Sequence, residues 1–202
     1  MTEINNLTLT SGSLPNDYQE VLYWRVTEKR SRAIGIQILG VLSFVIFGII
    51  FWGLAVSLGK LSAEGEFKFG LVEIGLMTAG ILLTLVLHEI THGWVMQMFG
   101  AKPKYGILWK SMMLYATSPG YVYQRNNYVV ILLAPFVVIS LLVVLGMWLL
   151  PGTLWGALLG ICGAVNASGA IGDMWMTMIV LRYATSAYVM DEQDGIRVFL
   201  PK

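Results

Sequence analysis

The chain contains two histidines, His88 and His92, which stand four residues apart with Glu89 directly after the first. Residues four apart on a helix share a face, so both imidazoles can bind one metal ion. The Glu89 carboxylate, one position on, can reach a water molecule on that metal and act as a general base. This H-E-x-x-H spacing, inside the apolar run TLVLHEITHGWVMQMFG, predicts a catalytic metal site. Ionisable groups in an apolar span are costly, which favours this hypothesis over a pair of core histidines.

A catalytic zinc ion usually has three protein ligands, and the chain offers no third histidine. Four acidic residues follow His92 in the sequence: Asp173, Asp191, Glu192 and Asp194. The last three stand in a polar segment, whereas Asp173 lies within an apolar run, so we predict Asp173 as the third ligand. Zn²⁺ is the expected cofactor, and the same ligand types would also accept other divalent ions.

The run GICGAVNASGAIGDMWMTM places Asn166 on the same helical face as Asp173, about two turns away. An amide at that position can hold a substrate backbone or stabilise an oxyanion, which makes Asn166 a candidate catalytic residue. A hydrogen bond between neighbouring helices explains the residue nearly as well. The sequence leaves both interpretations open.

Composition indicates the elements that must position these residues. Of the 202 residues, 56% are hydrophobic and 12% are charged, and the mean hydropathy is +0.70. Soluble domains carry about 25% charged residues, so the chain is expected to be an all-α integral membrane protein. Four apolar runs are each long enough for a transmembrane helix, which needs about 20 residues. They are Ala33–Gly59, Leu71–Phe99, Tyr128–Leu150, which contains Pro135, and Leu154–Leu181.

The positions of Lys and Arg predict the orientation. Placing residues 1–32, 100–127 and 182–202 in the cytoplasm leaves only Lys60 and Lys68 on the outer side, as the concentration of basic residues inside the cell requires. We therefore expect a multi-pass protein of the cell membrane, with a four-span domain over residues 33–181 and with both termini cytoplasmic. The lipid bilayer is the expected partner.

This topology also brings the candidate ligands to one depth. The second and fourth runs cross the membrane in the same direction, and His88, His92 and Asp173 all lie near their cytoplasmic ends. At about 1.5 Å per residue, the three side chains are expected some 12–18 Å from the inner boundary. Because the orientation rests on Lys and Arg alone, this agreement supports Asp173 independently.

The segments outside the spans carry weaker signals. Within the N-terminal tail, residues 18–26 predict either a short helix on the membrane surface or an ordinary lead-in. Residues 100–127, rich in Tyr, Ile, Leu and Val, favour a β-hairpin or a membrane-associated loop on the cytoplasmic side. The C-terminal tail, 182–202, has a weak signal for one short strand. A net charge of +1 gives no indication of a nucleic-acid partner, and the lone Cys162 excludes an internal disulfide. Composition does not predict an oligomeric state.

The pairing of LHEITHGWVM in one span with an Asn–Asp face two spans later resembles the site-2 type of intramembrane zinc metalloprotease. Over residues 20–200 the chain is more similar to the short bacterial zincin membrane peptidases. Those proteins share the H-E-x-x-H span, a hydrophobic loop with a late proline (here Pro119), an Ala-Pro pair (Ala134-Pro135) and an Asn…Gly-Asp span.

The resemblance implies that His88, His92 and Asp173 bind zinc and that Glu89 activates water. It also implies that residues 103–125 present a peptide or membrane-protein substrate as an added strand. The chain departs from the site-2 pattern, because Asn-x-x-Pro is replaced by NASG and Leu-Asp-Gly by GDM, and there is no PDZ-like insert. Zinc binding is expected despite these differences. Cleavage of transmembrane segments, as in site-2 proteases, does not carry over to this chain.

Our leading hypothesis is therefore a zinc metallopeptidase that hydrolyses a peptide bond near the cytoplasmic face, using water activated by Glu89. The alternative is a metal-binding membrane sensor or scaffold without enzymatic activity, which would need the histidines and not Glu89. A metal transporter is the weaker third hypothesis, because one polar cluster offers no path across the outer half of the membrane.

Overall fold

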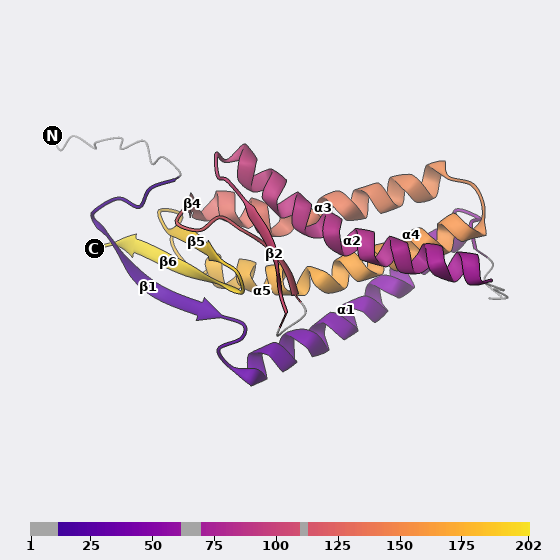
Figure 1. Cartoon of the computed structure of the whole chain (residues 1–202), viewed down its shortest axis with the longest axis horizontal. Helices are drawn as coiled ribbons and strands as arrows, with labels where there is room; N and C mark the ends of the chain where they lie inside the picture. The colour runs from indigo at the N-terminus through magenta and orange to yellow at the C-terminus, as the bar shows by residue number, and fades with distance from the viewer. Residues whose placement is uncertain (1–11, 62–69, 110–112) are drawn as a thin grey trace.

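The structure, a computed structural model, describes residues 12–61, 70–109 and 113–202. Four helical segments in it are long and apolar enough to cross a membrane (Figure 1). They are α1 (Arg30–Ser57), α2 (Leu71–Met98), α3 (Arg125–Leu149), and α4 (Thr153–Gly169) continued by α5 (Ile171–Val180). All four apolar runs thus form helices as predicted, and their ends differ from the expected limits by a few residues.

The fourth apolar run contains a break that the sequence did not predict. Helix α4 ends at Gly169 and α5 begins at Ile171, with Ala170 between them. The N–H of Ala170 still donates to the Asn166 carbonyl at 3.0 Å, and its own carbonyl accepts from Met174 at 2.9 Å. Helical hydrogen bonding therefore continues on both sides of the break, and the two segments together are long enough for one span.

The segment between the second and third spans forms the expected β-hairpin. Strands β2 (Lys104–Leu108) and β3 (Met113–Thr117) pair antiparallel, with Lys104 opposite Thr117 and Leu108 opposite Met113. The hairpin crosses the surface of α2 (Figure 1). This arrangement brings β3 to the helix that carries both histidines.

A second sheet corrects the all-α prediction. Its strands are β1 (Tyr18–Arg25), β4 (Val122–Gln124), β5 (Tyr188–Glu192) and β6 (Gly195–Pro201), in the order β1-β6-β5-β4. Every pairing is antiparallel, and the sheet lies at one end of the helical bundle (Figure 1). The fold is therefore a bundle of four long apolar helical segments with two small antiparallel sheets, and the C-terminal segment contributes two strands rather than one.

Strand β1 replaces the surface helix that the sequence allowed for residues 18–26. It pairs with β6 along its length, from Tyr18 opposite Pro201 to Arg25 opposite Gly195. Trp24 is buried while its neighbours Tyr23 and Arg25 are exposed, which is the alternation of a strand with one covered face. The partner strand, about 170 residues away, decides the conformation of this segment, and local sequence does not reveal it.

The sheet and the nearby helix ends share one hydrophobic core. Buried side chains from β1, β5 and β6 pack against others from α2, α3 and α5; these include Trp24, Val95, Met96, Tyr128, Ile131, Val180, Val189, Ile196 and Val198. A second core, around Phe51 and Met147, joins α1, α3 and α4 in the part of the bundle away from the sheet. The candidate histidines lie close to the first core, where helices and sheet meet.

Candidate metal centre

Helices α2 and α5 bring three candidate ligands together in the interior. His88 and His92 share one face of α2, and Asp173 stands in the first turn of α5. Asp173 Oδ2 lies 3.1 Å from His88 Nε2 and 3.3 Å from His92 Nε2. All three residues are buried, and one ligand atom from each lies within 4.8 Å of the others. The structure thus places the three residues selected from the sequence in one cluster.

The Nδ1 atom of each imidazole, the ring nitrogen that does not face Asp173, is held by a hydrogen-bond acceptor. His92 Nδ1 donates to the Ile131 carbonyl of α3 at 2.9 Å. His88 Nδ1 lies 3.0 Å from Asn166 Oδ1, an oxygen that can only accept. Both Nδ1 atoms must therefore carry hydrogen. In the neutral imidazoles, both Nε2 atoms are left with free lone pairs that face Asp173.

Three electron-rich atoms that converge in this way require a positive charge between them. The donor set of two imidazoles and one carboxylate is the kind that catalytic zinc sites use. Zinc bonds of about 2.0–2.1 Å at tetrahedral angles separate neighbouring ligand atoms by about 3.3 Å. The observed separations of 3.1 and 3.3 Å match this spacing. The residues therefore fit a zinc ion or a similar divalent cation.

Asn166 occupies a different position from the one that a substrate-binding residue needs. It is 1% exposed, and its Nδ2 donates to the Pro135 carbonyl at 3.2 Å and to the Phe136 carbonyl at 3.5 Å. These two contacts use both amide hydrogens, and Oδ1 accepts from His88. The side chain thus links α4, α3 and the first histidine. Of the two interpretations left open, the geometry favours the hydrogen bond between helices.

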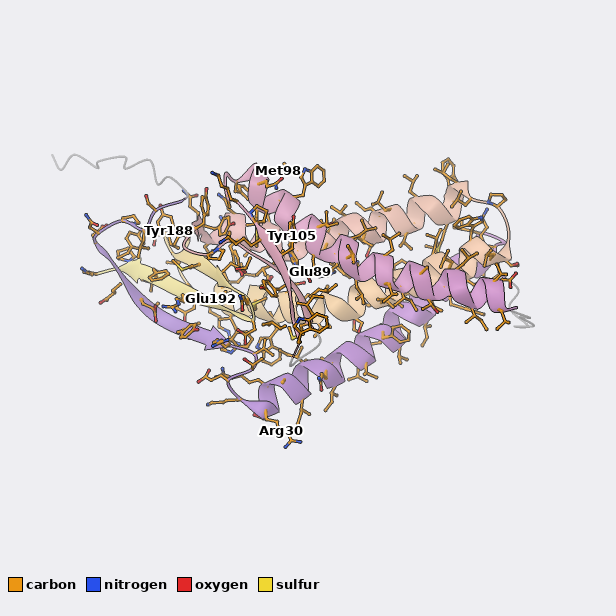
Figure 2. The ribbon with its side chains drawn as sticks, viewed as in Figure 1. Arg30, Glu89, Met98, Tyr105, Tyr188 and Glu192 are labelled. Carbon is orange, nitrogen blue, oxygen red and sulfur yellow. The ribbon has the colours of Figure 1, made fainter. Side chains whose placement is uncertain are left out.

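Glu89 lies beside the cluster, under the β2–β3 hairpin. Its carboxylate accepts a hydrogen bond from the backbone N–H of Ala116 in β3. Figure 2 shows Glu89 close to Tyr105 of β2, whose pKa is raised by burial and by the Glu89 charge. Tyr105 also packs over Gly93, where a Cβ atom would lie 2.1 Å from the phenol oxygen. The absence of a side chain at Gly93 therefore lets the hairpin lie against α2 next to the candidate base.

The cluster opens into a cavity of about 860 Å³. Its walls come from the N-terminal half of α1, the histidine face of α2, the edge of β3 and the turn between β5 and β6. The cavity is lined by His88, Glu89, His92 and Asp173, together with Met113 to Ala116 and Asp191 to Gly195. This volume is in the range of small-molecule and peptide-binding sites, about 300–1,000 Å³.

Asp191 is a buried cavity residue that sequence reasoning assigned to the polar tail. Its Oδ1 accepts a hydrogen bond from the Tyr128 hydroxyl at 2.5 Å. Burial raises the pKa of this carboxyl to about 7. Hydrogen bonds from Thr117 and Tyr128 act in the opposite direction and lower the pKa in part. Its position depends on the pairing of β5 with β4 and β6, and the sequence alone gives no local signal for that pairing.

Comparison with known proteins supports a metallopeptidase assignment. A family model with the description "Putative zincin peptidase" matches residues 81–188, more than half of the chain. No match is found among curated proteins or among solved structures. The matched region includes both histidines, Glu89 and Asp173, so the resemblance to zincin peptidases inferred from the sequence is confirmed. The chain belongs to this family of zincin peptidases.

Proposed function

We propose that the protein is a zinc-dependent, membrane-embedded metallopeptidase that hydrolyses a peptide bond near the cytoplasmic face. The observation that carries the proposal is the convergence of two bare Nε2 atoms and one carboxylate oxygen, with Glu89 in the same cavity. Family membership supports the reaction class. His88, His92 and Asp173 would hold the metal.

A zinc ion held by these residues would act as a Lewis acid, which would lower the pKa of bound water and polarise the substrate carbonyl. Glu89 then accepts the proton from the attacking water and passes it to the leaving amine. The Ala116 N–H orients the Glu89 carboxylate for this transfer, and Asn166 acts as a positioning residue through His88. Holding both imidazoles through Nδ1 keeps their Nε2 atoms directed at the metal.

We propose the edge of β3 as the binding site for an extended substrate. Among the described residues, β3 pairs with β2 along one edge only. On the other edge of β3, Met113 to Ala116 line the cavity. A peptide added as a third strand would pass beside Glu89, with its backbone hydrogen-bonded to β3. The substrate class is a peptide or a membrane protein with an extended segment near the membrane surface.

The fold supports the proposed topology. Strand β1 precedes α1 and strand β6 follows α5, so their pairing requires both strands to lie on the same side of a membrane. Four crossings between them satisfy this requirement, because the number must be even. The distribution of Lys and Arg assigns that side to the cytoplasm. The metal centre then lies near the cytoplasmic face.

The test compares purified wild type with Glu89→Gln in detergent, using elemental mass spectrometry for metal content. Fluorescently labelled casein and a library of quenched peptides serve as probes of cleavage. We expect about one zinc per chain in both proteins, and cleavage by wild type that falls by about 10²–10⁴-fold in Glu89→Gln. Full activity in Glu89→Gln would refute the mechanism. Zinc binding without cleavage by wild type would favour the sensor or scaffold alternative.

A further inference from the structure

Pro135 lies inside α3, and the helix continues through it. Proline has no N–H, so it cannot donate to the carbonyl four residues earlier, which is that of Ile131. Ile131 is fully buried, so water does not replace the missing donor. A buried carbonyl without a partner is costly, so the structure must satisfy this oxygen in another way.

The donor that satisfies Ile131 is a candidate metal ligand. His92 Nδ1 donates to the Ile131 carbonyl at 2.9 Å, across 39 residues of sequence. The oxygen that Pro135 leaves free in α3 is thus the one that holds His92. Pro135 also contributes its own carbonyl to Asn166 Nδ2 at 3.2 Å, and Asn166 in turn holds His88. One turn of α3 therefore orients both imidazoles.

We propose that Pro135 is a positioning residue of the metal centre: because it lacks an N–H, it reserves the Ile131 carbonyl for His92. The hydrogen bond fixes the hydrogen on Nδ1 and directs Nε2 at Asp173. The expected effect of Pro135 on metal binding rests on the proposed function, that is, on the proposed metal site. The hydrogen bond itself can be examined without metal.

Replacing Pro135 by another residue restores the missing donor. In Pro135→Ala, the new N–H of residue 135 competes with His92 for the Ile131 carbonyl, and the helix is expected to form at least as readily. His92 then loses its fixed acceptor, and its Nδ1–H is no longer held in place. Loss of such a partner typically weakens metal binding by about 10–100-fold. Pro135→Gly also restores the N–H and should behave alike.

The first measurement is nitrogen-15 NMR of imidazole-labelled, metal-free full-length protein in detergent, purified with a tag that contains no histidine. Because the chain has two histidines, two imidazoles give all the signals. We expect a hydrogen-bonded, slowly exchanging Nδ1–H for His92 in wild type, and we expect Pro135→Ala and Pro135→Gly to lose this signal. Val137→Ala, a change on the exposed face of α3, is the matched control and should retain the wild-type spectrum.

The second measurement is zinc affinity by chelator competition, with the Co²⁺ absorption spectrum as a report on ligand geometry. Both proline variants should bind zinc about 10–100-fold more weakly and show an altered spectrum, while Val137→Ala matches wild type. A wild-type Nδ1–H signal and wild-type affinity in both proline variants would overturn the inference. A defect in Pro135→Gly alone would also overturn it, because flexibility rather than the restored N–H would then be the cause. If wild type binds no metal, the proposed function fails, and the comparison of the His92 Nδ1–H signals still decides this inference.

Discussion

The ionisation of Asp191 provides a quantitative test of how dry the cavity is. Burial raises the pKa of this carboxyl to about 7 from its ordinary 3.8. Folding therefore favours the protonated form. The resulting stabilisation is fully present below the unfolded pKa, and it is lost as pH rises through the folded value. We expect the metal-free protein to be more stable in mild acid than in mild base because of this one group.

The magnitude follows from the two pKa values. Between them the contribution of Asp191 to the free energy of unfolding falls by about 1.4 kcal/mol per pH unit. From about pH 5 to about pH 8 the loss amounts to roughly 2–3 kcal/mol. For a protein of this length, that corresponds to a fall in Tm of roughly 5–10 °C. Replacing Asp191 by Asn removes the titrating group and hence this component.

The assay is equilibrium unfolding of metal-free wild type, Asp191→Asn and Tyr128→Phe in mixed detergent micelles at both pH values. Infrared difference spectroscopy, through the stretch of the protonated carboxyl, follows the titration directly. Tyr128→Phe removes a donor that favours the carboxylate, so the midpoint should rise above that of wild type. An equal pH-dependent loss in wild type and Asp191→Asn would refute the reasoning. So would an ionised Asp191 at about pH 5, because water would then reach the carboxyl.

Two further predictions concern the metal and the sheet. Removal of metal by a chelator should lower Tm, measured by thermal unfolding. Zinc at about 100 times its Kd should restore roughly 2.7 kcal/mol to the free energy of unfolding. No response of Tm to zinc would contradict the proposed metal site. Gly195→Ala should destabilise the fold by at least about 2 kcal/mol, because the new Cβ would lie 2.0 Å from the Trp24 carbonyl oxygen. Gly53→Ala, where nothing lies within 4 Å, is the control, and an equal Tm for the two variants would refute the contact.

The sequence predicted the parts of the molecule that depend on local pattern. Long apolar runs indicate helices whatever surrounds them, so the four helical segments long and apolar enough to cross a membrane were predicted. Helical spacing places His88 and His92 on one face, and equal depth in two spans selected Asp173 from four acidic residues. The hairpin over residues 104–117 was found because its β-forming residues lie between turn formers.

The missing parts depend on contacts between distant segments. The pairing of β1 with β6 joins residues about 170 positions apart, and Asp191 is buried in β5, a strand of the same sheet. The contact between His92 and Ile131 escaped prediction because a backbone carbonyl carries no side-chain signature. Pro135, four residues after Ile131, was the available signal, because a proline inside a helix leaves the carbonyl four residues earlier without its backbone donor.

The pairing of β1 with β6 also sets an order of events during protein synthesis. The ribosome releases β1 before any of the four helices, and β1 must wait for its partner until the last helix has been made (Figure 1). Asp173 is synthesised late as well, and the β5–β6 turn that closes the cavity follows it. A growing chain thus carries both histidines and Glu89 while the whole segment between His92 and Asp173 is made, before the proposed third ligand and the enclosing wall exist. The proposed hydrolytic site is therefore completed only in one of the final steps of the chain's assembly.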